Sequence, residues 1–187
     1  MVFYPNLNHE GLDRFREKFD PSYPVYKEHM PFLHPIPDSV TLGSVQRHLA
    51  RVLDHWEPFS VHFNGLIKSW DHWLLLGVRE GADKVRELRY EIYSGILKPF
   101  LREDLPFEPH LGLGLFAGDG FDPFSPVDSD LREAEYNAAY AGAKKLNFDF
   151  WCKVNVLDLI KGENDLRIRP VTIREYNIKK RMNNLNL

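Results

Sequence analysis

Two short segments of the sequence carry a histidine in the same local pattern. They read His29-Met30-Pro31-Phe32 and His110-Leu111-Gly112-Leu113, so that each histidine is followed by an apolar, a small and a second apolar residue. Histidine is the side chain whose ordinary pKa lies near neutrality, and two imidazoles in one place can serve as general acid and general base. One copy in each half of the chain predicts a pseudo-symmetric fold that brings His29 and His110 to one cleft.

Each histidine taken singly is more simply a structural or surface residue. The repeated pattern favours a shared site, and the residues alone leave open whether that site is catalytic. His34 lies five residues from His29, on the opposite face of an extended segment, so we do not expect these two to form a joint site. His62 and His72 are expected to be solvent-facing or hydrogen-bonded.

The hydrophobic periodicity predicts the elements that must position the two histidines. Apolar residues at three- and four-residue spacings predict helices over residues 11–19, 44–56, 82–100 and 131–145. Alternating and extended apolar runs predict strands over residues 25–33, 59–65, 67–70, 73–78, 106–116, 148–156 and 166–176. Hairpin-joined strands interrupted by helices are typical of an α+β protein with antiparallel sheets. With no low-complexity linker in the sequence, residues 1–187 are expected to form a single domain.

Composition narrows the class of protein. The 187 residues carry a net charge of −3, which argues against a dedicated duplex-DNA binder. No run reaches the roughly 18–20 apolar residues of a membrane span, and the N-terminus lacks the features of a signal peptide. We therefore expect a cytoplasmic protein that is not associated with membranes.

The single cysteine and the spacing of possible metal ligands argue against two further kinds of site. Cys152 has no partner for a disulfide, and it alternates with Phe150 and Val154 on an apolar face, so we expect a buried, inert thiol. No second cysteine or histidine stands at metal-ligand spacing. The sequence therefore predicts no metal site, and we expect no cofactor.

The chain resembles the two-histidine phosphoesterase superfamily, which includes the 2′-5′ RNA ligase-like proteins and the cyclic phosphodiesterases. The resemblance rests on the two histidine motifs, on Pro35 after the first and Pro109 before the second, and on the strand 59–65 between them. A closing hairpin over residues 154–160 and 167–173 completes the expected order. The resemblance implies a bilobal α+β fold, with two pseudo-symmetric antiparallel-sheet lobes, helices on the outside and a central cleft.

The resemblance also implies a chemistry. Family enzymes act on 2′,3′-cyclic or 2′-5′ phosphodiester linkages of nucleotides or RNA ends, by hydrolysis or ligase-like transfer, with two histidines as acid and base. We expect His29 and His110 to take these roles, and the sequence does not say which is which. The partner would be a nucleotide or an RNA-terminal phosphodiester, and the oligomeric state is not indicated.

The chain departs from the family at both motif positions that normally carry a hydroxyl. Pro31 and Gly112 stand there, and neither side chain can hydrogen-bond a phosphoryl oxygen. Gly112 keeps a backbone N–H and opens space near His110, while Lys27 shares a strand face with His29 and could attract an anion. We therefore place Lys27 and Gly112 among the substrate-binding residues. The departure also supports an alternative, a non-catalytic module that binds nucleotides or RNA ends.

Two further features bear on a ligand. Residues 117–128 are rich in Gly, Asp and Pro and predict a long loop, which could cover the cleft or be an insertion without a role. The tryptophans Trp70, Trp73 and Trp151 are most simply core or sheet-face aromatics. Stacking of a base on Trp70 or Trp73 is the minority interpretation.

Overall fold

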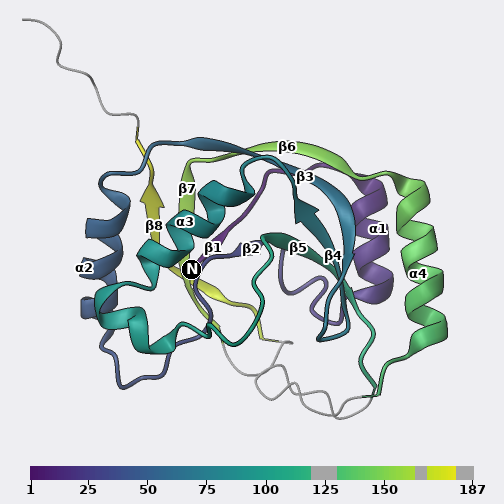
Figure 1. Ribbon diagram of the computed structural model, residues 1–187, viewed down its shortest axis with the longest axis horizontal. Helices are drawn as coiled ribbons and strands as arrows, with labels where there is room; N and C mark the ends of the chain where they lie inside the picture. The colour runs from purple at the N-terminus through teal and green to yellow at the C-terminus, as the bar shows by residue number, and fades with distance from the viewer. Residues whose placement is uncertain (119–129, 163–167, 180–187) are drawn as a thin grey trace, which may run out of the picture.

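The structure is a computed structural model that describes residues 1–118, 130–162 and 168–179 (Figure 1). Within these ranges the helices are α1 (Glu10–Phe19), α2 (Leu42–Leu53), α3 (Ala82–Ile92), the 3-10 helix η1 (Gly95–Phe100) and α4 (Glu133–Leu146). The strands are β1 (Val2–Phe3), β2 (Met30–Pro31), β3 (Phe59–Lys68), β4 (Trp73–Val78), β5 (His110–Leu115), β6 (Asp149–Val154), β7 (Val156–Lys161) and β8 (Val171–Asn177).

The strands form two four-stranded antiparallel sheets. One sheet has the order β2-β1-β7-β8, and the other, curled into a half-barrel, has the order β5-β4-β3-β6. Only Asn155 separates β6 from β7, so the chain passes directly from one sheet to the other. The edge strands β2 and β5 lie against each other in the middle of the molecule (Figure 1). The predicted α+β class with antiparallel sheets is confirmed, and we call the place where these edges meet the β2–β5 junction.

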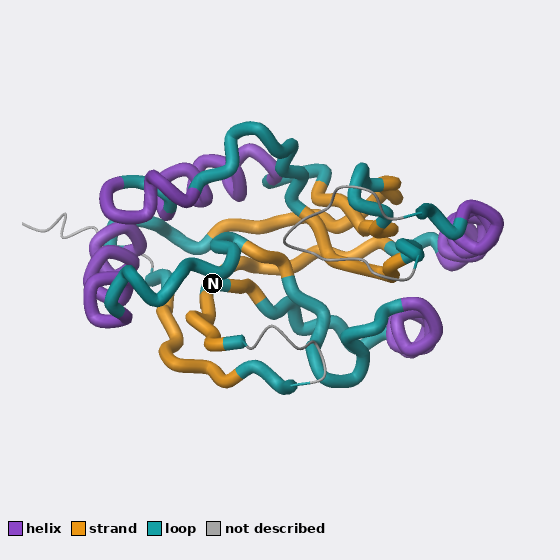
Figure 2. The backbone as a smooth tube through the Cα atoms, turned by 90° about the horizontal axis from the view of Figure 1, so that it is seen from below, coloured by secondary structure: helices purple, strands orange, loops and turns teal. Residues whose placement is uncertain are grey.

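The helices lie on the outside, at the two ends of the molecule (Figure 2). Helix α1 packs on β5 and α4 packs on β3, while α2 packs against α3 and η1. The close approach of α1 to β5 depends on Gly114, because a Cβ atom at this position would lie 2.6 Å from the Cβ of Phe19. The glycine therefore allows α1 to seat directly on the strand that carries His110.

Several predicted element boundaries were wrong. The strand predicted over residues 25–33 is reduced to β2, with Phe32 and Leu33 donating further backbone hydrogen bonds to the Met1 carbonyl. Its partner β1 was missed, because two residues carry no periodicity. The predicted strands 59–65 and 67–70 are one strand, β3, in which the register shifts near Gly65 (φ 89°).

The helix predicted over residues 82–100 was also wrong in its length. It ends at Ile92 and is followed by η1, since Gly95 adopts a left-handed conformation (φ 53°) and Pro99 cannot donate the next helical hydrogen bond.

Cys152 is partly rather than fully buried, and burial raises the pKa of its thiol, as expected of an unreactive group.

Most of the predicted loop 117–128, the start of the predicted last strand and most of the C-terminal tail lie outside the described residues. None of the helices in the described ranges combines the length and the apolar character that a membrane crossing requires.

Candidate active site at the β2–β5 junction

The two motif histidines hold equivalent positions in the two sheets. His29 immediately precedes β2 and His110 opens β5. In both segments the burial alternates: His29 and His110 are half-buried, and the residues that follow them, Met30 and Leu111, are fully buried in the core. Since alternate residues of a strand face the same way, Gly112 shares the face of His110. Both imidazoles therefore project from the core at the β2–β5 junction.

The backbone fixes the same tautomer in both histidines. Nδ1 of His29 lies 2.8 Å from the carbonyl oxygen of Lys27, and Nδ1 of His110 lies 2.5 Å from that of Glu108. A carbonyl oxygen only accepts, so each Nδ1 carries the proton and donates it. In each ring Nε2 is then the atom available to accept or deliver a proton to a ligand.

The junction favours the neutral form of both histidines. Burial lowers the pKa of His29, and the positive charges of Arg16 and His110 lower it further. Burial also lowers the pKa of His110, where Asp71 opposes the effect and Arg89 adds to it. The two imidazoles thus lie close enough for the charge on one to disfavour protonation of the other.

A buried ion-pair network holds the segment that leads into His29. Arg16 on α1 places Nη2 2.6 Å from Oδ2 of Asp20 and Nη1 3.3 Å from Oε2 of Glu28. The same guanidinium donates to the carbonyl oxygen of Tyr26 at 2.9 Å. Because the arginine and Asp20 side chains are each only 3% exposed, this network is shielded from solvent and fixes the chain just before His29.

Two tyrosines flank the His29 ring. The ring centroid of Tyr4 lies 6.0 Å from that of His29, and the Tyr26 centroid lies 6.1 Å away. Burial is the largest cause of the raised pKa of Tyr4, so its hydroxyl keeps its proton at neutral pH. Two aromatic side chains therefore lie close to the first histidine.

Sequence reasoning missed Arg89 and gave His34 no part in a joint site with His29, yet both lie near the junction. Arg89 on α3 is 6% exposed, donates from Nη1 to the carbonyl oxygen of Phe32 at 3.1 Å, and lies 4.0 Å over the ring of Phe107. Desolvation, Arg89 and His110 lower the pKa of His34 to about 4. His34, which the spacing placed apart from His29, interacts electrostatically with His110.

The position of Arg89 in its predicted helix is a sequence feature that indicates burial. It falls on the buried stripe of its helix with Val85 and Ile92, where an arginine is unusual. Among the described residues, no carboxylate lies within ion-pair distance of its guanidinium. The guanidinium of Arg89 is therefore a buried positive charge without an ion-pair partner among the described residues, and it lies next to the segment that follows His29.

The structure places Lys27 and Gly112 differently from each other. The Lys27 side chain is exposed, and it is its carbonyl oxygen that contacts His29. Gly112 lies two residues after His110 on the same face, where an added Cβ would meet the Trp73 ring at 3.4 Å. Gly112 therefore lies at the junction. Lys27 contacts His29 only through its backbone carbonyl oxygen.

His62 takes part in a separate cluster. Its Nε2 lies 2.9 Å from Oδ1 of Asp149, its Nδ1 contacts Glu80, and its ring stacks on Trp151 with centroids 4.5 Å apart. Hydrogen bonds that the ring donates to the carboxylates of Asp149 and Glu80 raise the pKa of His62. The expectation of a hydrogen-bonded His62 is confirmed, and both of its ring nitrogens are occupied.

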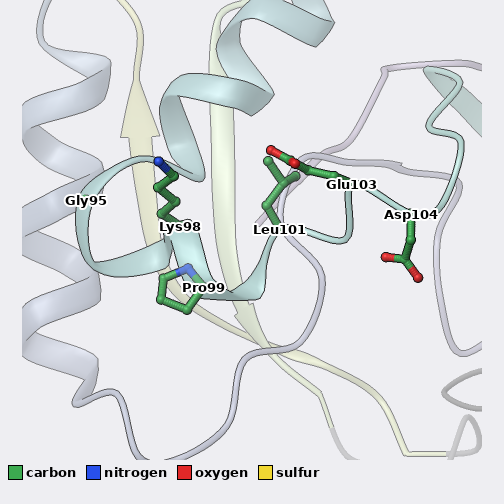
Figure 3. A pocket seen from close by; sticks show the side chains of 6 residues that line it. All are labelled: Gly95, Lys98, Pro99, Leu101, Glu103 and Asp104. Atoms are coloured by element: carbon green, nitrogen blue, oxygen red, sulfur yellow. The ribbon is translucent and has the colours of Figure 1, made fainter.

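The surface also has an open hollow of about 610 Å³ on η1 and the segment after it (Figure 3). It is lined by Gly95, Lys98, Pro99, Leu101, Glu103 and Asp104. It contains neither motif histidine, and its charges are of both signs. The chemistry-bearing residues are therefore at the β2–β5 junction rather than in this hollow.

Within the described residues, no group of three or more His, Cys, Asp or Glu side chains is arranged to hold a metal ion.

Comparison with protein families matches residues 3–165 to the 2′-5′ RNA ligase superfamily. The match covers both histidine motifs and all the strands from β2 to β7. A search among curated proteins found no match.

Proposed function

The chain belongs to the 2′-5′ RNA ligase superfamily, and on this basis we propose that it hydrolyses or transfers 2′,3′-cyclic or 2′-5′ phosphodiester linkages of nucleotides or RNA ends without a metal ion. The observation that supports the proposal is the pair His29 and His110, each with Nδ1 donating to a backbone carbonyl and Nε2 left for substrate. Two such imidazoles supply both proton transfers that the reaction needs.

In hydrolysis of a 2′,3′-cyclic phosphate, one neutral Nε2 removes a proton from the attacking water as its oxygen bonds to phosphorus. The protonated Nε2 of the other histidine donates its proton to the ribose oxygen as the P–O bond breaks. The base gains a proton and the acid loses one. Proton exchange of the two imidazoles with solvent then restores the starting protonation state. Each transfer contributes about 10²–10⁴-fold.

The negative charge that develops on the phosphoryl group also needs stabilisation. Pro31 and Gly112 bring no hydroxyl, and the buried guanidinium of Arg89 is a positive charge that interacts with both His110 and His34. Its low exposure favours action through the electrostatic field rather than by direct contact with substrate. The exposed Lys27 is proposed to add a second, solvent-screened charge.

The proposal is tested by turnover of nucleoside 2′,3′-cyclic monophosphates and of RNA oligonucleotides with 2′,3′-cyclic ends, in the presence of a chelator. Turnover that persists with chelator supports the phosphodiesterase. Binding of the same compounds without turnover would instead support the alternative, a nucleotide- or RNA-end-binding module, which the loss of both motif hydroxyls favours. Neither binding nor turnover would overturn both functions.

The pH dependence of kcat/KM follows from the lowered pKa values. The free enzyme needs one neutral and one protonated histidine, and burial lowers the pKa of His29 and of His110 below the ordinary 6.5. We expect a bell-shaped profile with its maximum below pH 6.5, because at higher pH both rings lose their protons. Bound phosphodiester, being anionic, favours the protonated rings, so the kcat profile should lie at higher pH. A kcat/KM maximum above pH 7.5 would contradict this assignment.

Replacing Lys27 by methionine tests its proposed role in attracting substrate. An exposed charge contributes about 0–1 kcal/mol, so we expect KM to rise about two- to fivefold at low salt, with little change in kcat. The difference should shrink as salt screens the charge. Lys144→Met, at an exposed position of α4, is the matched control. Equal effects of the two substitutions would remove Lys27 from the site.

A further inference from the structure

Trp73 lies on the same side of the half-barrel as the second histidine motif. It opens β4, whose Leu75 and Gly77 pair with Gly112 and His110 of β5. Paired residues of neighbouring strands face the same way, and Leu75 and Trp73 are alternate residues of one strand. The indole of Trp73 is half-buried, so part of its surface is accessible.

The indole of Trp73 lies directly beside Gly112. A Cβ added to Gly112 would lie 3.4 Å from Cζ3 and 3.5 Å from Cε3 of Trp73. These distances are ordinary van der Waals contacts. The position that normally carries the second motif hydroxyl therefore adjoins an aromatic ring on the face of His110.

The backbone of Trp73 is held from two directions. Its N–H donates to Oγ of Ser69 at 2.9 Å, and its carbonyl oxygen accepts from Oη of Tyr136 at 2.6 Å. These bonds tie the start of β4 to the β3–β4 turn and to α4, and they fix the backbone from which the indole projects. A preorganised side chain loses little entropy on binding.

Two other tryptophans, Trp56 and Trp151, already have partners. Trp56 donates from Nε1 to Glu91 at 2.7 Å, and Trp151 stacks on His62. In the part of the chain that the structure describes, neither a hydrogen bond from Nε1 nor a stacked ring is found for Trp73. Its aromatic surface and its donor are thus available at the edge of the junction.

We infer that Trp73 is a substrate-specificity residue that stacks on the base of the nucleotide whose phosphodiester reaches His29 and His110. The inference rests on the proposed function and narrows its substrate class, to base-bearing cyclic phosphates and RNA ends in preference to phosphodiesters without a base. Stacking on Trp73 would supply binding that a chain without the hydroxyl at position 112 lacks. Base–aromatic stacking corresponds to about five- to 150-fold in affinity.

The test compares adenosine 2′,3′-cyclic monophosphate with glycerol 1,2-cyclic phosphate, which has no base. In Trp73→Ala the ratio of the two kcat/KM values should fall about five- to 150-fold, and Trp73→Phe should keep most of the preference. Trp151→Ala, at an exposed tryptophan stacked on His62, is the matched control and should leave the ratio unchanged. An unchanged ratio in Trp73→Ala, or an equal fall in Trp70→Ala, would overturn the inference.

A reciprocal exchange tests the coupling between the two positions. Gly112→Thr alone should weaken nucleotide binding, since its methyl and hydroxyl groups extend beyond a Cβ that already contacts the indole and crowd the stacking face. Combined with Trp73→Ala, the same threonine should fit, and the double variant should process the two substrates with nearly equal efficiency. A Gly112→Thr variant that keeps its preference for the nucleotide would contradict the proposed arrangement.

Failure of the inference and failure of the proposed function give different results. If the wild type turns over neither substrate, the phosphodiesterase is wrong, and stacking is then measured by quenching of tryptophan fluorescence with adenosine 2′,3′-cyclic monophosphate. Quenching that Trp73→Ala weakens at least fivefold, and Trp151→Ala does not, supports the stacking residue in a binding module. Equal quenching in the wild type and Trp73→Ala overturns it.

Discussion

Replacing either His29 or His110 by alanine is expected to lower kcat for hydrolysis of adenosine 2′,3′-cyclic monophosphate by about 10²–10⁴-fold. Each imidazole has Nδ1 donating to a backbone carbonyl, and alanine removes the Nε2 atom that moves the proton. The double variant should be little slower than either single variant, since the two proton transfers belong to one step. Initial rates at saturating substrate, near the pH maximum of the wild type, provide the measurement.

The control is His55→Ala, which removes an exposed imidazole after α2 and should leave kcat unchanged. His34→Ala distinguishes a second possibility, because His34 also interacts with His110. If His34→Ala abolished turnover while His29→Ala did not, the pair would be His34 and His110. Full activity in both His29→Ala and His110→Ala would exclude the two-histidine mechanism.

Replacing Arg16 by methionine is expected to lower the free energy of unfolding by about 3–5 kcal/mol. The substitution leaves Asp20 buried and Glu28 largely buried without the guanidinium that pairs with both. Removal of one partner of a buried ion pair is costly because the remaining charge is not solvated. Urea unfolding followed by circular dichroism measures the change, with the slope of the transition as a check on two-state behaviour.

Arg14→Met is the matched control, since Arg14 pairs with Glu10 at the same helical spacing but with both side chains more than 70% exposed. It should cost about 0–1 kcal/mol. We also expect Arg16→Met to reduce turnover at temperatures where the variant is folded, because the network holds the segment before His29. Similar losses of stability in the two variants would show that the Arg16 network contributes no more than a surface pair.

The local pattern of the sequence determined much of this protein. The repeated histidine motifs, the alternation around them and the helical stripes were sufficient to predict the α+β class and most elements, and they single out His29 and His110 as the proposed site residues. Such features depend on neighbours a few positions away, since the side-chain periods of strands and helices are short. For the same reason, Gly112 could be assigned to the face of His110 from spacing alone.

The residues that surround the two histidines depend on tertiary contacts that the sequence pattern does not reveal. The two-residue strand β1, which joins β2 to the rest of its sheet, carries no periodicity and gains its place by pairing. Arg89 reaches the junction because α3 packs beneath Phe32, and the ring of Trp73 takes the space beside Gly112 because β5 pairs with β4 in a shifted register. These contacts join segments far apart in the chain, and they depend on sheet curvature and packing, which local periodicity does not specify.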